Sequence, residues 1–438
     1  MYFQQSIFLL SIKTEIMKFK LFYKASQFLI ITFLFSACKK EVKKEEMQVE
    51  IFSAANGINS KSGKVDVSNV EQLYTAVNDP ENAGHEIVLA PGTYILNPGY
   101  PNSGRIELLH DMSLRGQPGK AEQVIIDGSA LPGSSFLLPP HPTFPGVKRT
   151  GVIRMGNGTN ALEWLTVKGH ATTNAYSVIE TDLNTTSITN IRVAHCIVTG
   201  GQIGLNIRNR EAEASGRIIE AEIANNEFTG NVTGFGQGIG FFNARDMTNG
   251  IIRARLKGNY VHGNRIGLRA WNVVSNHCSI EIESNADRFE DNGAGLALLG
   301  AFNEYPNFTA NDNYVSFGAY GSTILNNLGI PAPPSGTAQV FPGGMMAIGA
   351  MVSVNSFPAT TSNNKLTIKF WGCQFDGNLA PYDINALGAR STYPSLNPAG
   401  TNNVVNIWLN GISVNATASL TPSFPIEAAG TNTVNVYR

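Results

Sequence analysis

Short apolar–polar alternations recur along the sequence at intervals close to 30 residues, which is typical of β-strands with one buried face. Each repeat has an alternating strand, a small or Asn-rich corner, and then an apolar residue two or three positions before Gly or Asp. We call these apolar residues anchors; they are spaced by 31, 30, 33 and 28 residues and are Val167, Val198, Phe228, Val261 and Phe289. Phe317 and Phe375 extend the series, so the sequence predicts a solenoid of stacked coils.

A second short strand follows each corner, as in GNRIGLRAWN at residues 263–272. Its alternate positions are apolar, and the intervening ones are Arg265, Gly267, Arg269 and Trp271. Four such strands have a glycine at their second position, and these glycines are Gly204, Gly240, Gly267 and Gly295. We expect the four to lie in one row on an outward face and to leave a shallow floor that a ligand can approach.

Charges on the first strand of each repeat alternate in sign from one repeat to the next. Six residues before the anchors lie Arg192, Glu222, Arg255 and Glu283, and eight before lie Glu220, Arg253 and Glu281. This alternation is expected if consecutive coils stack in register, about 4.8 Å apart. Each exposed pair contributes only about 0–1 kcal/mol, but the ladder penalises a slipped register.

Coils of this length, with short strands and Asn-rich corners, resemble the right-handed parallel β-helix of the pectin-lyase-like superfamily. NVEQLYTAV (69–77) resembles the helix that covers the open end of such a solenoid, and EIVLAPGTYIL (86–96) resembles a first coil. The resemblance extends from about Val65 to the C-terminus. It implies an all-β, single-stranded right-handed parallel β-helix solenoid with an N-terminal capping helix and long loop insertions.

From Met17 the sequence has the features of a bacterial lipoprotein signal. A lysine-rich stretch precedes the apolar run Phe28–Phe35, which is too short to span a bilayer, and FSAC then resembles a lipobox ending at Cys38. We therefore expect lipidation at Cys38 and a protein anchored to the outer membrane or cell surface. The expected divisions are an unused upstream extension (1–16), a signal peptide (17–37), a lipidated flexible tether (38–62) and the β-helix (63–438).

The composition of the chain limits which partners and cofactors we expect it to bind. The formal net charge of -1 gives no overall attraction to nucleic acid. Apart from Cys38 there are three cysteines, an odd number, and no CxxC or His-rich spacing, so we expect buried free thiols and no metal site. No motif supports calcium either, and we expect no cofactor.

The outward face of the second strands is the candidate site. Aromatic rings stack on sugars and guanidinium groups pair with carboxylates, so Asn206, Arg208, Phe242 and Trp271 are predicted to bind an acidic polysaccharide. The alternative is that Phe242 and Trp271 pack beneath the inserted loops.

Catalysis is the more specific hypothesis. Polysaccharide lyases, which this fold resembles, neutralise a uronate carboxylate and remove the neighbouring proton; Arg265 and Arg269 could do the first and His262 the second. A glycosidase needs two carboxyl groups about 5–9.5 Å apart. The predicted floor lacks such a pair, although Glu180 and Asp182 lie near its first coil. We expect the groove to bind an acidic polysaccharide and, if the protein is an enzyme, to cleave it as a lyase and not as a glycosidase; the alternative is a non-catalytic glycan-binding or scaffold protein.

Overall fold

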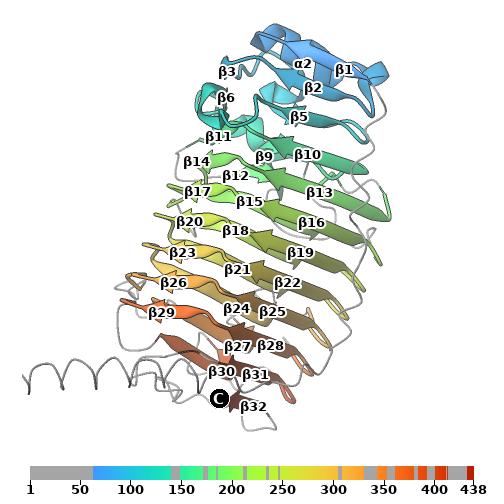
Figure 1. Cartoon of the computed structure of the whole chain (residues 1–438). Coiled ribbons are helices and arrows are strands. Elements are labelled where there is room, and N and C mark those ends of the chain that lie inside the picture. Colours follow the sequence, from blue (N-terminus) through green and yellow to red (C-terminus); the bar gives the residue numbers. More distant parts are fainter. Residues whose placement is uncertain are drawn as a thin grey trace, which may run out of the picture. The chain divides into compact units, whose positions relative to one another are not determined.

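The chain divides into two compact units, Met1–Gly57 and Ile58–Arg438, and all described residues belong to the second. The computed structural model describes residues 63–139, 148–170, 176–183, 186–210, 215–232, 236–244, 247–303, 308–329, 343–352, 361–378, 383–391, 400–410, 412 and 432–438. These residues form three parallel sheets that run the length of a solenoid, and a complete coil, such as the one with β13, β14 and β15, contributes one strand to each sheet (Figure 1).

Sheet A is the largest of the three. Its strands, in spatial order, are β1 (Lys64–Val67), β2 (Glu86–Leu89), β5 (Ser113–Arg115), β10 (Thr159–Glu163), β13 (Ile188–Ala194), β16 (Ile218–Ala224), β19 (Ile251–Lys257), β22 (Ser279–Asn285), β25 (Tyr314–Tyr320), β28 (Lys365–Trp371), β31 (Val404–Asn410) and β32 (Thr433–Tyr437). Sheet B comprises β3 (Gly92–Ile95), β6 (Val124–Asp127), β11 (Thr166–Lys168), β14 (Ile197–Thr199), β17 (Glu227–Thr229), β20 (Tyr260–His262), β23 (Arg288–Glu290), β26 (Thr323–Leu325) and β29 (Gln374–Asp376).

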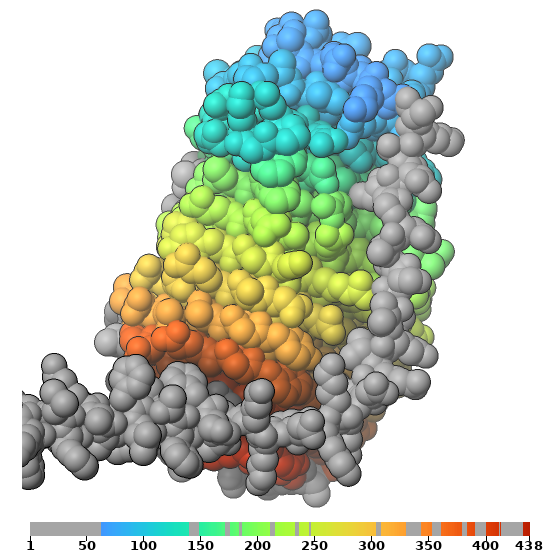
Figure 2. Space-filling view, in the orientation of Figure 1, coloured from blue at the N-terminus to red at the C-terminus, as the bar shows by residue number. Residues whose placement is uncertain are grey.

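Sheet C comprises β4 (Ile106–Glu107), β9 (Gly151–Arg154), β12 (Ser177–Glu180), β15 (Ile203–Arg210), β18 (Gln237–Ala244), β21 (Ile266–Val273), β24 (Ala294–Asn303), β27 (Met345–Val352) and β30 (Ile384–Ser391). A small antiparallel pair, β7 (Leu137–Leu138) with β8 (Lys148–Arg149), projects from an early coil. Short 3-10 turns lie at Pro80–Asn82, Pro101–Gly104, Ala121–Gln123 and Gly133–Phe136. In the space-filling view the coils follow one another as successive bands of colour (Figure 2).

The capping helix is confirmed as α2 (Val70–Asn78). The Asn69 side chain accepts a hydrogen bond from the backbone N–H of Gln72 at 2.9 Å and so caps the first turn. The apolar face of α2, which includes Leu73 and Val77, is buried in the same core as the first coils. Within the described residues, no helix is long and apolar enough to cross a membrane.

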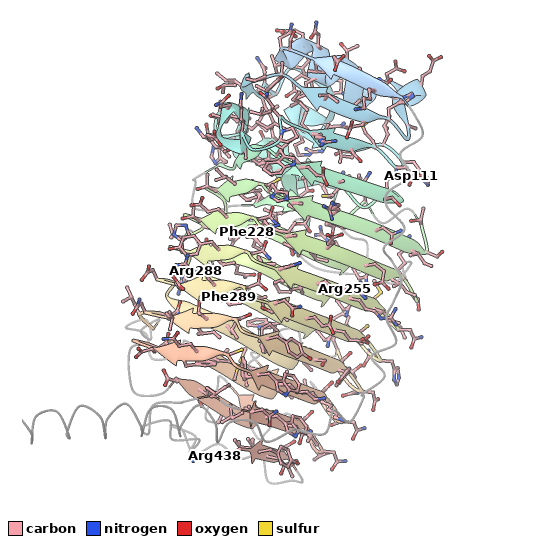
Figure 3. All side chains as sticks on the ribbon, in the orientation of Figure 1. Asp111, Phe228, Arg255, Arg288, Phe289 and Arg438 are labelled. Atoms are coloured by element: carbon pink, nitrogen blue, oxygen red, sulfur yellow. The ribbon has the colours of Figure 1, made fainter. Side chains whose placement is uncertain are left out.

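The predicted anchors are confirmed as one column of sheet B. Each pairs with the next through parallel strands, each is fully buried, and they are Val167, Val198, Phe228, Val261 and Phe289. Figure 3 shows Phe228 and Phe289 in this column, two coils apart, with the coil of Val261 between them. The prediction for Phe317 is wrong, because it lies in β25 opposite Ile282. Ile324 follows Phe289 instead, since extra residues between β24 and β25 lengthen this coil to 35 residues.

The charge ladder is confirmed residue by residue on the outer face of sheet A. Arg192 pairs with Glu222, Glu222 with Arg255, and Arg255 with Glu283. Arg192 also donates to Glu163 at 2.6 Å, so it bridges the coils on both sides. Opposite charges therefore hold adjacent coils in one register.

The structure corrects the predicted glycine row in two ways: one glycine of the row is a different residue, and the row does not form an open floor. Asn206 and Arg269 both pair with Gly240, so Gly238, and not Gly240, stands between Gly204 and Gly267. A Cβ on Gly204 would lie 2.6 Å from the carbonyl oxygen of Gly238. The expected shallow floor is wrong, because the neighbouring coil's backbone fills this space.

Each corner of the coil is closed by a residue in the left-handed conformation and by a ladder of amide side chains. At the corner between sheets A and B the left-handed residues include His195, Asn225 and Ala286. At the corner between sheets B and C, Asn264 Oδ1 accepts from the backbone N–H of Asn231 at 3.1 Å, and its Nδ2 donates to the carbonyl of Phe228 at 2.9 Å. These bonds satisfy backbone groups that strand pairing leaves unpaired.

A second ladder, at the corner between sheets A and B, is interrupted by an acid. Asn226 and Asn259 each donate to a backbone carbonyl, and Asp287 takes the next position. Asp287 is fully buried and accepts from Ser284 Oγ at 2.6 Å and from Asn259 at 2.7 and 2.8 Å. Burial raises the pKa of Asp287 to about 6, against the opposing effect of its hydrogen bonds.

We predict that Asp287→Asn makes the fold more stable at neutral pH. The raised pKa means that the protonated form of Asp287 favours folding, so its contribution is complete below pH 4 and is lost as the pH rises through 6. The advantage of Asn should grow by up to about 3 kcal/mol between pH 4 and pH 8, measured by urea denaturation. Asp291→Asn, at an exposed left-handed corner position, is the control. An advantage that does not change with pH would refute this account of the ladder.

Candidate functional site

The outer face of sheet C has a polar half and an apolar half. In the polar half one column runs from Glu107 through Arg154 and Glu180 to Asn206, one residue per coil. The same column continues through Gly240 and Arg269 to the apolar residues Ala297 and Met346. The change of character therefore falls between β15 and β24.

The apolar half is a second hydrophobic cluster outside the coil interior. Its buried members are Ile203, Phe242, Ala244, Ile266, Trp271, Ala294, Ala297, Leu299, Phe302, Met346, Ile348 and Met351. Two predicted ligand-binding residues belong to it: Trp271 is 1% exposed and Phe242 is 7% exposed. Their burial agrees with the alternative of packing beneath inserted loops, most of whose residues lie outside the described part of the chain.

Arg269 is part of the same packing. Its guanidinium carbon lies 3.0 Å from the centroid of the Trp271 ring and 5.4 Å from that of Phe242. The indole N–H of Trp271 donates to the carbonyl of Ala297 at 3.2 Å. Arg269 is only 8% exposed, so in this structure its contacts are those of a cation held against two rings.

The three predicted catalytic residues are not brought together. His262 belongs to β20 of sheet B, where its Nε2 lies 2.9 Å from Glu227 Oε1 and its ring stacks on Tyr260 at 4.0 Å. Arg265 lies on the corner between β20 and β21, and Arg269 lies in sheet C. The corner turns the chain from one sheet to the next, which separates residues that are close in sequence. Their catalytic roles remain predictions without a shared site.

The polar half contains a cluster of arginines and acids, of which the sequence analysis assigned only Arg208 to the site. Arg154 donates from Nε to Asp182 Oδ1 at 2.8 Å and from Nη1 to Glu107 Oε1 at 2.7 Å. Arg105 donates to Glu107 Oε1 at 3.0 Å, and Arg210 Nη1 lies 3.6 Å from Asp182 Oδ2. Four strands of sheet C or their ends thus supply one connected network.

Glu180 is the most buried acid of this cluster and the one whose acidity is most affected. Its Oε2 accepts from Ser177 Oγ at 2.6 Å and from Asn206 Nδ2 at 2.7 Å, while its Oε1 lies 3.5 Å from Arg208 Nε. Burial raises the pKa of Glu180, the charge of Asp182 adds to the rise, and Arg208 opposes it. The raised pKa shifts Glu180 toward its neutral form.

The acidic and the basic side chains of this cluster differ in their exposure to solvent. The side chains of Glu180 and Asp182 are each 1% exposed, whereas those of Arg154 and Arg208 are 13% and 20% exposed. The predicted binding residue Asn206 is fully buried, and Arg208 is the member of the predicted set that reaches the surface of the cluster. The cluster therefore presents two partly exposed arginine side chains beside buried acids.

A signal for this cluster was present in the sequence. Glu180 and Asp182 alternate with a period of two, and Arg208 and Arg210 alternate in the same way about one coil later. Two acids and two bases at that spacing predict facing partners on stacked strands.

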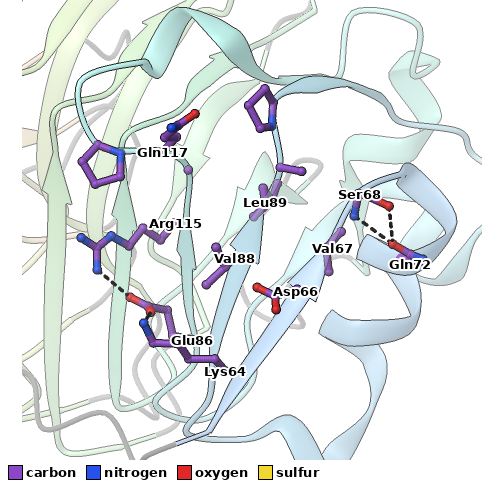
Figure 4. Close-up of a pocket in the computed structure, with 14 residues that line it drawn as sticks. Lys64, Asp66, Val67, Ser68, Gln72, Glu86, Val88, Leu89, Arg115 and Gln117 are labelled. Atoms are coloured by element: carbon purple, nitrogen blue, oxygen red, sulfur yellow. Dashed lines mark hydrogen bonds and ion pairs between the residues drawn. The ribbon is translucent and has the colours of Figure 1, made fainter.

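A concavity of about 740 Å³ lies elsewhere, over the first strands of sheet A (Figure 4). Glu86 lies between two bases in it, with Oε2 at 3.3 Å from Lys64 Nζ and Oε1 at 3.2 Å from Arg115 Nη1. Asp66 adds a second acid, so the charges balance. This surface lacks the surplus of exposed cations seen on sheet C.

Comparison with known proteins adds little to this geometry. No family model and no curated protein matches the chain. Similar solved structures include the A-module of mannuronan C-5 epimerase AlgE4 from Azotobacter vinelandii (TM-score 0.34, 13% identity, 84% of this chain and 97% of that one) and the Family 28 exopolygalacturonase from Yersinia enterocolitica (TM-score 0.26, 9% identity, 85% and 78%). An N-terminal fragment of gene product 12 of bacteriophage Phi29 is also similar (TM-score 0.29, 11% identity, 77% and 66%). Because these TM-scores are below 0.5, the likenesses carry no argument about function, and the fold is described from the strand pairing.

We predict that Asp182→Asn destabilises the fold by about 3–5 kcal/mol, because it leaves Arg154 and Arg210 buried without their shared acid. Arg210→Met in the same background should recover part of this loss. A double-mutant cycle by urea denaturation should give a coupling energy of about 0.5–3 kcal/mol. Additive effects of the two substitutions would show that the network is not coupled.

Proposed function

We propose that this chain binds an acidic polysaccharide on the outer face of sheet C, along β9, β12 and β15. The observation that carries the proposal is the cluster in which Arg154 and Arg208 are partly exposed above the buried acids Glu180 and Asp182. A guanidinium group pairs with a carboxylate through two parallel hydrogen bonds, which suits the uronate groups of such a polymer.

The charge balance supports an anionic ligand. Among the residues that the structure describes, four arginines (105, 154, 208 and 210) lie with three carboxyl groups (107, 180 and 182), and the raised pKa of Glu180 lowers the negative charge further. Neutralising this surplus within a partly buried site is favourable for an anion and unfavourable for a cation. The cluster therefore selects against a cationic or neutral polymer.

The stacking of coils supports an extended ligand. Arg154 and Arg208 lie two strands apart in sheet C, which is about 10 Å along the solenoid axis. Two cations at that separation can contact different sugar residues of one chain. A polymer lying along the axis would engage both, and a single sugar would not.

Cleavage by β-elimination is the second part of the proposal. A lyase needs a proton acceptor beside the arginines, and among the described residues Tyr176 is a titratable group linked to Arg210 through Arg149. Its ring lies 5.4 Å from the guanidinium carbon of Arg149, whose carbonyl accepts from Arg210 at 3.1 Å. Tyr176 also stacks on Phe136 at 4.7 Å, and Phe136 lies 6.2 Å from His170. Tyr176 and His170 thus replace His262 as candidates for proton transfer.

The alternative of a non-catalytic glycan-binding or scaffold protein predicts binding without cleavage. The same cluster serves both, because the arginines recognise the ligand and only the proton acceptor distinguishes the two. Ultraviolet absorbance from unsaturated sugar ends, measured in parallel with binding, separates them.

We predict that Arg208→Gln weakens binding of polygalacturonate to the full chain about tenfold, because one charge-assisted contact is lost. Arg208→Lys should lose less, since it keeps the charge but not the fork. Affinity electrophoresis of the full chain in mild detergent measures both. Arg192→Gln, on the outer face of sheet A, is the matched control. An equal loss in the control, or none at Arg208, contradicts the proposal.

Anchoring through lipid at Cys38 belongs to the same proposal, although residues 1–62 lie outside the described part of the chain. A lipidated cysteine followed by the tether 38–62 would hold the β-helix at the outer membrane or cell surface, where polysaccharides are available. This placement rests on the lipobox-like sequence alone.

We predict that Cys38→Ser abolishes incorporation of radiolabelled palmitate and releases the protein from the membrane fraction. Cys196→Ser, a buried thiol whose pKa burial raises to about 12, should keep both the label and the membrane association. Labelling of the Cys38→Ser protein would exclude this anchor.

A further inference from the structure

The outer face of sheet A changes character beyond β22. Up to β22 its charged residues form the alternating ladder, and the last acid of that ladder is Glu283. The next four strands are β25, β28, β31 and β32, with the sequences YVSFGAY, KLTIKFW, VVNIWLN and TVNVY. These strands contain two lysines and no Asp or Glu.

Aromatic residues and Lys369 form a continuous band across these four strands, which lie side by side at the C-terminal end of the solenoid (Figure 1). Tyr320 stacks on Trp371 with ring centroids 4.8 Å apart, and Trp408 stacks on Tyr437 at 4.7 Å. Lys369 joins the two stacks, with its Nζ at 5.9 Å from the Trp371 ring and 5.5 Å from the Trp408 ring.

The polar groups of this band have no partners within the described residues. The side chains of Lys365, Lys369, Trp371, Trp408 and Tyr437 make no hydrogen bond or ion pair with any other described residue. This differs from the other half of the same sheet, where opposite charges face one another along the ladder. Lys365 is exposed, Tyr437 is 45% exposed, and the remaining three are half-buried.

The orientation of the stacked rings determines which of their atoms can face solvent. The two rings of each pair are nearly parallel, with interplanar angles of 1° and 17°, and they come from consecutive coils. The rings therefore cover one another's faces along the axis and leave their edges uncovered, although the Tyr320 hydroxyl lies back over Gly318. Aromatic edges carry the positive end of the ring quadrupole, and indole N–H and phenol O–H groups donate hydrogen bonds. With the lysines, they make a donor-rich and cationic surface.

A purely structural role explains the stacks but not their surroundings. Stacked rings stabilise adjacent coils wherever they occur. They do not require the absence of acids over four strands, nor lysines without an acidic partner. Those two features favour an anionic ligand with many oxygen acceptors.

We propose that β25, β28, β31 and β32 form a second binding surface, on sheet A, for an anionic polysaccharide. The choice of ligand rests on the proposed function, but the surface is separate from the arginine cluster of sheet C. Lys365 and Lys369 pair with carboxylate or sulfate groups, and the ring edges of Trp371 and Trp408 donate to neighbouring oxygens. The two sites would let one long polymer, or two, be held at once.

The test uses the full chain in mild detergent with polygalacturonate and dextran sulfate as probes and neutral dextran as the negative control. The double variant Lys365→Gln/Lys369→Gln should weaken binding of both anionic probes about fivefold or more, with no effect on dextran. Lys257→Gln, at an exposed lysine at the end of β19 in the same sheet, should leave binding unchanged. An equal effect of the two variants, or none, overturns the proposal.

A second measurement does not depend on altering the lysines. Trp371 and Trp408 are two of the four tryptophans, so polygalacturonate should change the fluorescence of the full chain, and Trp371→Phe should reduce that change. The Arg208→Gln protein should still show this fluorescence change. If binding is lost at sheet C but the change remains, the sheet A surface is supported and the sheet C site is not. If the change is lost but Arg208 still contributes to binding, the sheet C site is supported and the sheet A surface is not. Loss of binding to phosphatidylglycerol vesicles in the double variant, with polygalacturonate binding intact, would assign the surface to membrane lipid and refute the proposal.

Discussion

The structure depends on one constraint, which is that every coil must stack on the next in register. A parallel strand pair satisfies only the backbone groups within the strands, so each corner must supply its own hydrogen bonds. Asn264 is an example: its side-chain oxygen accepts from the backbone N–H of Asn231, and its side-chain nitrogen donates to the carbonyl of Phe228, both in the preceding coil. Because such residues recur at each corner, the register is the same in all three sheets, and residues at equivalent positions form columns along the axis.

These columns of equivalent residues also determine where a functional site can form. A functional side chain in one coil is flanked by the equivalent side chains of two neighbouring coils, so a site is a block of columns and not a single loop. On sheet C the block from Glu107 to Arg210 holds charge, and the block from Phe242 to Met351 holds a second apolar cluster. The buried acids keep the arginines in place while leaving the side chains of Arg154 and Arg208 partly exposed. This arrangement is suited to recognising an anionic polymer, which we propose.

Much of the fold could be predicted from the sequence because the columns repeat. The anchors from Val167 to Phe289 and the alternation of Arg255 with Glu283 are visible as a period, and the structure confirms them. The prediction failed where a coil changed length, as at Phe317, and where a strand was displaced by two residues, as at Gly240. A two-residue displacement keeps the inside and outside positions unchanged, so the alternation of apolar and polar residues cannot detect it.

The site was harder to predict, for two physical reasons. Burial on the outer face of sheet C depends on segments far away in sequence, so Trp271 reads as an exposed ring from its own strand alone. His262 and Arg269 are close in sequence but are separated by a corner, whereas Glu107 and Arg154 are 47 residues apart and share a hydrogen bond. Proximity in this fold follows the coil and not the sequence.

The most direct test of the central claim is an arginine-labelling experiment on the full chain. Phenylglyoxal modification, followed by peptide mass spectrometry, would be compared with and without polygalacturonate. The account predicts slower modification of Arg154 and Arg208 with the polymer and an unchanged rate at Arg115, which is on sheet A and 36% exposed. Neutral dextran should protect none of the three. Equal protection of Arg115, or no protection of Arg208, would contradict a polysaccharide site on sheet C.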